Sequence, residues 1–227
     1  MPDKRRQRQG LFMLLGLLLL FGISCTHQAT SGTYSTSNLS SFEHSVFKEI
    51  NRARTHPADY AAFLENTKAR YDTLSLKIPG EERRQADDSL QPFNEAIEVL
   101  KAATPLPPLK LSGGLSAAAR DHLHDQGKGD KVSHTGSDGS TLADRATRYG
   151  SWESGLGENI AHGSDTPQRL AMQLIIDQSN PGRDYRLNIL NPAFAVAGIA
   201  CGDSVQHRNL CVITFAGKYV EKATGTQ

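Results

Sequence analysis

The stretch of sequence that decides the fold is AVAGIACGDSVQHRNLCVITF, which runs from Ala195 to Phe215. Its two ends, residues 195–201 and 211–215, are apolar runs of strand length. A connection that contains Gly202, Asp203 and Asn209 separates them, and these residues are typical of turns. The pattern predicts a β-hairpin that places Cys201 across from Cys211.

Helical patterns fill most of the sequence before this hairpin. Ser40 and Glu43 form a capping box in front of an apolar stripe that reaches Ala53. The expected helices begin near Ser40, Pro57, Pro92, Ser112, Thr141 and Thr166. A short strand is expected over 157–163, and the polar, charged residues 73–89 are expected to form a solvated excursion without an assigned function. This order predicts an α+β fold with one domain over residues 40–220 and a C-terminal tail over 221–227.

The composition bounds the kind of protein. The chain has 227 residues, with 25 Lys and Arg against 24 Asp and Glu, and 7% aromatic residues. This length is enough for one or at most two domains with a sizeable core. Nucleic-acid binders usually carry a basic face or a row of stacking aromatics, so we expect no nucleic-acid partner.

The N-terminus has the pattern of an export signal. Basic residues between Lys4 and Arg8 precede an apolar run over 11–23, which is too short to cross a bilayer comfortably. The run ends at Ser24-Cys25, and residues 21–25 resemble the lipobox of bacterial lipoproteins, except that Gly22 replaces the usual Leu-like residue. We expect a signal peptide over 1–24, a lipid on Cys25 and a Ser/Thr-rich tether over 25–39. The protein would then be extracytoplasmic and held at the membrane by its lipid, and plain secretion is the alternative.

The remaining two cysteines fit an exported protein. If a lipid modifies Cys25, Cys201 and Cys211 are left as an even pair ten residues apart. A disulfide between them would stabilise the fold by roughly 2 to 3 kcal/mol on the chain-entropy model. Two buried thiols that never pair are the alternative.

Common catalytic motifs are missing from the sequence. It contains no HExxH, no Walker A loop, no CxxC pair and no G-x-S-x-G elbow. The polar residues that interrupt apolar surroundings are His134, Glu158, Asp177 and the cluster 183–186. Each has a structural alternative: a loop-end hydrogen bond for His134, a strand anchor for Glu158, a surface position for Asp177, and solvation or pairing with Asp184 for the two arginines of the cluster. His122 lies on an apolar helix face, which favours a hydrogen-bonded core histidine.

Seven motifs in order carry a family resemblance. They are Asn51-Arg52-x-Arg54, Ala118-Ala119-x-x-His122, His134 in a glycine loop, Gly157-Glu158-Asn159-Ile160, Tyr185-Arg186-Leu187-Asn188-Ile189-Leu190, Gly198-Ile199-Ala200-Cys201-Gly202 and Cys211-Val212-Ile213-Thr214-Phe215-Ala216. Together they resemble the CAP superfamily, the SCP-like domain of cysteine-rich secretory proteins, antigen 5 and plant pathogenesis-related proteins, in its bacterial form. The resemblance covers about residues 40–220.

The resemblance implies an α-β-α sandwich with a short antiparallel sheet and a cleft lined by two His and two acidic residues. In some members these residues bind zinc or another divalent ion. His134 and Glu158 match the first His and the Glu of the family pattern, and Asp177 is the best candidate for the second acid. Tyr185 stands where the family has its second His.

The change to Tyr185 weakens the expected metal site. A neutral phenol is a poor zinc ligand, so we expect at most a weakly bound divalent ion, with calcium or magnesium favoured over zinc. His162 lies four residues after Glu158 and is an alternative source of the missing imidazole.

The sequence is compatible with three functions. The first is a non-catalytic binding or interaction module whose ligand is a lipid, peptide or protein of the cell envelope or its surroundings. The second is a structural envelope protein with a vestigial cleft. The third is a hydrolase that uses the His/Glu cleft, which needs a nucleophile or activated water close to His134 or Glu158.

Overall fold

A computed structural model of the chain describes residues 34–75, 81–126, 133–203 and 209–223. The predicted signal peptide, Cys25 and the loop residue His207 lie outside these ranges. None of the helices in the described ranges combines the length and apolar character that a membrane span needs.

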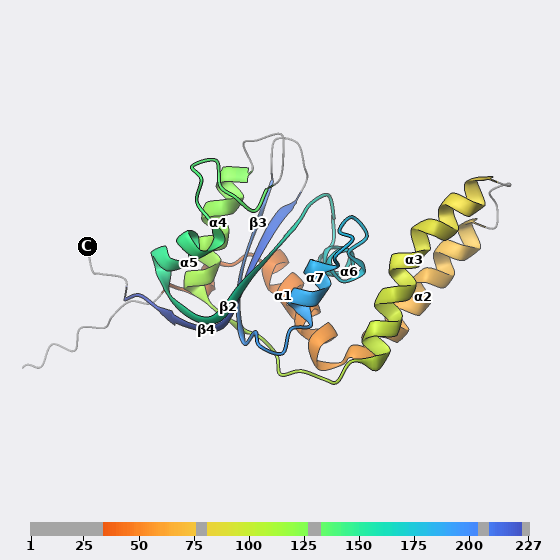
Figure 1. Cartoon of the computed structure of the whole chain (residues 1–227), viewed down its shortest axis with the longest axis horizontal. Coiled ribbons are helices and arrows are strands. Elements are labelled where there is room, and N and C mark those ends of the chain that lie inside the picture. Colours follow the sequence, from red (N-terminus) through yellow and green to blue (C-terminus); the bar gives the residue numbers. More distant parts are fainter. Residues whose placement is uncertain (1–33, 76–80, 127–132, 204–208, 224–227) are drawn as a thin grey trace, which may run out of the picture. The chain divides into compact units, whose positions relative to one another are not determined.

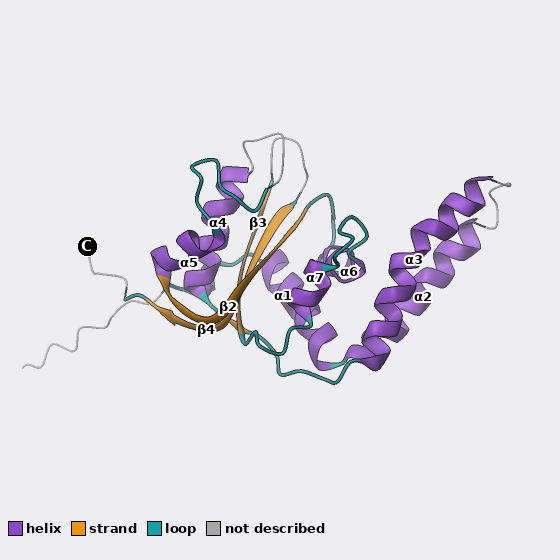
Figure 2. Cartoon of the chain, in the orientation of Figure 1, coloured by secondary structure: helices purple, strands orange, loops and turns teal. Residues whose placement is uncertain are grey.

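The structure contains the predicted hairpin and helices, together with a helix over 184–189 and a two-residue strand over 110–111 that the sequence patterns did not indicate. The helices are α1 (Ser41–Thr55), α2 (Pro57–Ser75), α3 (Glu81–Ala102), α4 (Gly113–Gln126), α5 (Leu142–Tyr149), α6 (Pro167–Ile176) and α7 (Asp184–Ile189), with a short 3-10 helix, η1, over Thr36–Asn38. The strands are β1 (Lys110–Leu111), β2 (Gly150–Ala161), β3 (Val196–Gly202) and β4 (Leu210–Glu221). Figure 1 shows this order along the chain, and Figure 2 separates helices from strands.

The four strands form one sheet in the order β1-β3-β4-β2. The long strands are antiparallel, and only the two-residue β1 runs parallel to β3. Successive side chains of a strand point to opposite faces, so each face of the sheet builds its own core. Ile213 of β4 joins the cluster that contains residues of α1 and α6, whereas Val212 joins the cluster that contains residues of α4. The predicted α+β sandwich, with helices on both faces of the sheet, is therefore confirmed (Figure 1).

Several predicted helix starts are confirmed by their caps. The hydroxyl of Ser40 accepts a hydrogen bond from the backbone N–H of Glu43, and the Glu43 carboxylate accepts one from the N–H of Ser40. Pro57 is the first residue of α2, and Thr166 caps α6. The side chains of Ser40, Glu43 and Thr166 satisfy backbone donors that would otherwise lack a partner at the start of a helix.

The third helix differs from the one predicted from the sequence. It begins at Glu81 and not at Pro92, so much of the expected excursion is helical and Pro92 lies inside α3. The Glu, Arg and Gln residues over 81–85 have high helix propensity. The proline therefore costs one backbone hydrogen bond without ending the helix. α2 and α3 pack against each other as a helical hairpin (Figure 1).

The second strand also differs from the prediction. It begins at Gly150, seven residues before the expected Gly157, and ends at Ala161. Gly150 directly follows α5 and has an extended φ of −176°, so the strand begins where the helix ends. A Cβ atom there would lie 2.4 Å from the Tyr219 ring. Glycine is thus required because β4 approaches closely.

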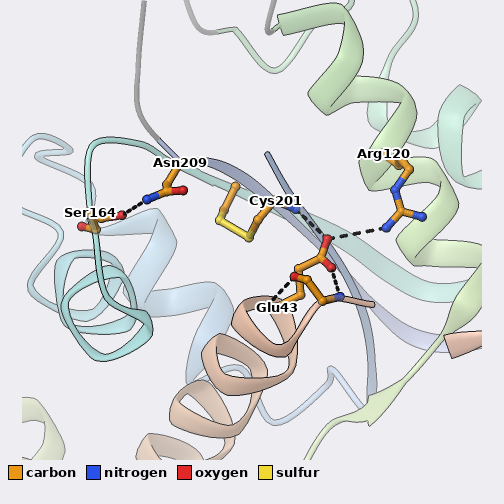
Figure 3. The surroundings of a disulfide bond; sticks show 7 residues. Glu43, Arg120, Ser164, Cys201 and Asn209 are labelled. Atoms are coloured by element: carbon orange, nitrogen blue, oxygen red, sulfur yellow. Dashed lines mark hydrogen bonds and ion pairs between the residues drawn. A yellow bond between two sulfur atoms is a disulfide. The ribbon is translucent and has the colours of Figure 1, made fainter. Parts of the chain in front are cut away.

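The predicted disulfide between Cys201 and Cys211 is present. The two residues face each other in the β3–β4 register, with Cα atoms 4.1 Å apart. The buried carboxylate of Glu43 accepts a hydrogen bond of 2.8 Å from the Cys201 N–H and lies 3.5 Å from Arg120 of α4 (Figure 3). Glu43 therefore joins the start of α1 to the end of β3 beside the disulfide.

Arg54 holds the segment that follows α7. This side chain is almost fully buried, and its guanidinium donates to the carbonyl oxygens of Ile189, Asn191 and Phe194 at 2.5 to 3.0 Å. A cation near the C-terminal carbonyls of a helix is favourable for the helix dipole. This contact fixes α7, and with it Tyr185, relative to α1.

Candidate functional site

Glu158 is the centre of a buried polar cluster on one face of the sheet. It pairs with Thr214 across β2 and β4, and its side chain faces the layer of α4 and α5. One carboxylate oxygen, Oε2, accepts a hydrogen bond of 2.8 Å from Arg145. The other, Oε1, lies 2.9 Å from Nδ1 of His134 and 3.7 Å from Nε2 of His122. Both oxygens therefore have partners from this chain.

Arg145 organises this cluster. Its side chain is only 2% exposed, and besides Glu158 it donates to the carbonyl oxygens of His134 at 3.1 Å and Ser140 at 3.0 Å. A capping box between Thr141 and Asp144 fixes the start of its helix, α5. Arg145 thus ties the loop that carries His134 to the strand that carries Glu158.

No motif in the sequence marks Arg145 as a site residue. The signal that could have indicated Arg145 is its place next to Ala146 on the inner side of a short helix. These two residues are the buried ones of α5. Charged side chains are almost never fully buried without a partner. An arginine on such a face therefore indicates a carboxylate nearby.

The two histidines beside Glu158 differ in exposure. The His134 side chain is 53% exposed, so its ring meets both Glu158 and solvent. His122 is fully buried, and burial lowers its pKa below the ordinary value of 6.5. Its Nε2 lies 2.8 Å from the carbonyl oxygen of Ser133, which can only accept, so Nε2 carries the proton. The predicted core histidine is confirmed, and among the described residues its Nδ1 has no partner.

Asp177 lies on the other side of β2. It follows α6 in a left-handed conformation with φ 53°, and its carboxylate is buried. Oδ2 accepts hydrogen bonds from the backbone N–H groups of Tyr185 at 2.8 Å and Arg186 at 3.4 Å. Burial raises the pKa of Asp177 above its ordinary value. The carboxylate thus fixes the first turn of α7.

Tyr185 connects the two sides of the edge strand. Its ring lies edge-on to the His134 ring, with centroids 6.1 Å apart. Its carbonyl oxygen accepts a hydrogen bond of 3.0 Å from the side chain of Asn159, which follows Glu158 in β2 and points to the opposite face. Burial raises the pKa of the Tyr185 phenol, so the hydroxyl is neutral at physiological pH.

The arginines of the 183–186 cluster have a different partner from the expected one. Arg183 lies 2.7 Å and Arg186 lies 3.4 Å from the carboxylate of Glu95 in α3, and neither is paired with Asp184. Glu95 is far away in sequence, which is why local spacing could not reveal it. These contacts join α7 to the helical hairpin.

The residues present do not fit a metal ion. The guanidinium of Arg145 already lies where a metal ion would bind Oε2 of Glu158, and its positive charge would repel that ion. Asp177 is turned to backbone amides, so His134 and Glu158 are brought together but Asp177 is not. Within the described part of the chain, no three His, Cys, Asp or Glu side chains form a metal-binding group. β2 ends at Ala161, so the regular-strand argument for His162 does not hold.

A pocket lies on the Asp177 side of the site, and we name it the Tyr185 pocket. Its volume is about 280 Å³, and its lining residues are Phe93, Ile160, Ala161, Gln173, Leu174, Ile176, Asp177, Gln178, Ser179 and Tyr185. The apolar ones are buried core residues, whereas Gln173, Gln178 and Ser179 are exposed. The pocket therefore has an apolar floor and a polar mouth that opens to solvent.

Comparisons with known proteins give the family. A family model for the cysteine-rich secretory protein family, CAP, matches residues 47–218. No curated protein gives a significant match.

Two solved structures are similar to the chain at low identity. An outer surface protein from Borrelia burgdorferi is 18% identical, with a TM-score of 0.42, and the match covers 49% of this chain and 78% of that protein. An extracellular protein containing a SCP domain from Bacillus anthracis str. Ames is 23% identical, with a TM-score of 0.41 and coverages of 62% and 44%. Since the family model spans most of the sequence, the chain belongs to the cysteine-rich secretory protein (CAP) family.

Proposed function

We propose that this CAP domain is a non-catalytic binding module outside the cytoplasm, tethered by a lipid on Cys25, whose ligand occupies the Tyr185 pocket. The observation that carries the proposal is the pocket itself. Its floor is made of rigid core residues, and its polar groups converge at the mouth. Preformed apolar pockets with a few polar groups are the usual form of small-ligand sites.

The partners of Glu158 argue against its use as a catalytic base. A general base needs a free carboxylate within hydrogen-bond reach of the proton that it removes. Here Arg145 and His134 hold the two carboxylate oxygens at 2.8 and 2.9 Å. The buried ion pair also holds Glu158 in place, which suits a structural role.

A hydrolase is the second candidate, and one observation favours it. Nδ1 of His134 is bonded to Glu158, and its half-exposed ring leaves Nε2 directed away from that bond. A carboxylate that orients a histidine in this way is typical of general-base pairs. Digestion of a peptide library by the full chain tests this function. We expect no cleavage, and cleavage that disappears in His134→Ala would favour the hydrolase.

Ligand-observed NMR on the full chain tests the binding proposal. A library of small fragments, each sized for about 280 Å³, should yield binders that compete with one another for one site. Ser179→Trp, a substitution at the exposed mouth, should abolish their binding. Ser151→Trp is the matched control, because Ser151 is exposed and does not line the pocket. Absence of binders, or binders that are indifferent to Ser179→Trp, would overturn the proposal.

A further inference from the structure

The Tyr185 pocket has a charge of one sign. Asp177 is the only Asp, Glu, Lys or Arg side chain among its lining residues. The neighbouring cations, Arg183 and Arg186, do not line it; both contact the Glu95 carboxylate, and both also act on Asp177, where they oppose the effect of burial on its pKa. Arg183 also donates a hydrogen bond of 2.9 Å to the backbone carbonyl of Asp177. The pocket thus presents an acid without a basic side chain in its wall.

The two oxygens of this carboxylate are used unequally. Oδ2 accepts from the amides of Tyr185 and Arg186, which fixes the position of the group. Oδ1 accepts no hydrogen bond from any described residue, although the side chain is only 3% exposed. A carboxylate oxygen that no donor of the chain engages can accept a hydrogen bond from a ligand in the pocket.

The remaining walls select the rest of the ligand. Phe93, Ala161, Leu174 and Ile176 supply apolar surface, and all four are at most 9% exposed. Ile160 also lines the pocket, but its side chain packs in the α4 cluster on the other face of the sheet. Phe93 comes from α3, so the helical hairpin contributes to the floor together with the sheet and α6. A short hydrocarbon chain fits this floor.

From these observations we infer that the Tyr185 pocket binds an alkylammonium group, whose hydrocarbon chain contacts the apolar floor and whose ammonium donates to Oδ1 of Asp177. This inference rests on the proposed binding function and names its ligand chemistry. A free alkylamine and the side chain of a lysine both carry such a group. The raised pKa of Asp177 agrees with it, because a cation in the pocket would compensate the carboxylate for lost solvation.

The experiment compares three probes of equal chain length, namely n-hexylammonium, 1-hexanol and hexanoate, by calorimetry on the full chain at neutral pH. We expect n-hexylammonium to bind at least about tenfold tighter than 1-hexanol, and hexanoate to bind weakest. Equal affinities for the amine and the alcohol would overturn the ammonium inference but leave the binding function standing. If no probe binds and the fragment library also yields no binder, both fail.

Two variants locate the effect. Asp177→Asn removes the charge but keeps an oxygen that accepts the amide hydrogen bonds, and asparagine tolerates the left-handed backbone. It should reduce the preference for the amine to within about twofold. Asp184→Asn is the matched control, because it removes a neighbouring charge that does not line the pocket. A preference that survives Asp177→Asn, or that Asp184→Asn removes equally, contradicts the assignment to Asp177.

A peptide distinguishes the two sources of the group. Acetyl-Gly-Lys-Gly-amide should displace n-hexylammonium if the pocket accepts a lysine side chain. Displacement assigns the ammonium site to a lysine side chain. Absence of displacement assigns it to a free amine, and both results are consistent with an ammonium site.

Discussion

The guanidinium of Arg145 lies 2.8 Å from the carboxylate of Glu158, and both side chains are buried between the sheet and the α4–α5 layer. Arg145 supplies the positive charge that balances Glu158, in the place where the family resemblance led us to expect a divalent ion. Both oxygens of Glu158 thus have partners from this chain.

The first prediction concerns this ion pair. Arg145→Met should lower the free energy of unfolding by about 3 to 5 kcal/mol, because it leaves Glu158 as an uncompensated buried charge. Adding Glu158→Gln should recover part of the loss. Arg148→Met is the control, since Arg148 is 42% exposed and its ion pairs should contribute about 1 kcal/mol or less. Urea unfolding measures all of these variants, and equal losses for Arg145→Met and Arg148→Met would contradict the prediction.

The second prediction concerns the disulfide. Replacing both Cys201 and Cys211 with Ser should lower the free energy of unfolding by roughly 2 to 3 kcal/mol, because the unfolded chain loses a closed loop. Denaturant unfolding of the oxidised, reduced and double-Ser proteins provides the measurement. An unchanged midpoint on reduction would show that the strand pairing alone holds this hairpin.

The third prediction restores the family's second histidine. The rings of Tyr185 and His134 have centroids 6.1 Å apart, and two imidazoles on one tetrahedral zinc ion have centroids roughly 5 Å apart. Tyr185→His should therefore tighten zinc binding by at least about tenfold, or ~1.4 kcal/mol. Calorimetry on wild type, Tyr185→His and Tyr185→His with His134→Ala tests this, and the gain should vanish in the double variant. Tight zinc binding by the wild type would mean that other residues hold the ion.

The fourth prediction follows from the buried acid at the end of α6. Burial raises the pKa of Asp177 from its ordinary value of 3.8, so the folded protein binds this proton more tightly than the unfolded chain does. The tighter proton binding by Asp177 stabilises the folded protein most at low pH. This stabilisation is lost as the pH rises through the pKa that Asp177 has in the folded protein. The stability of Asp177→Asn relative to wild type should therefore increase as the pH rises from about 3.5 to 7. Urea midpoints of both proteins across this range give the result, and a relative stability that falls with pH would refute it.

The fifth prediction concerns export. We expect the mature protein to begin at Cys25 with diacylglycerol on its thiol, because the preceding sequence has the pattern of a lipoprotein signal. Mass spectrometry of the envelope fraction identifies the N-terminus. Cys25→Ala should release the protein from the membrane, and continued membrane association of this variant would rule out the lipid anchor.

Local patterns predicted those parts of the fold that local chemistry determines. The capping box at Ser40 and the proline at Pro57 specify helix starts within a few residues, and the strand pattern around Cys201 specifies the hairpin. The helix start predicted at Pro92 is wrong because a proline can either start a helix or lie within one, and the residues before it decide between the two.

The candidate site was only partly predictable for a different reason. The order of the motifs led us to expect His134 and Glu158 close together, and the two are in contact. It could not show which face of the sheet each of the two acids, Glu158 and Asp177, would occupy. Glu158 faces α4 and α5, whereas Asp177 turns to the first turn of α7. The partners Arg145 and Glu95 come from helices whose positions depend on tertiary packing, so sequence spacing does not show which carboxylate or arginine each one contacts.

The contact between Glu43 and Cys201 has a mechanical consequence (Figure 3). A pulling force on the chain ahead of η1 meets first Tyr34, whose ring lies edge-on to that of Tyr149, and then the start of α1, where Glu43 holds the Cys201 N–H. The load then passes into β3 and, through the disulfide, into β4, the central pair of the sheet. Tension at the N-terminus is thus shared by covalently linked strands before it can peel α1 from the core.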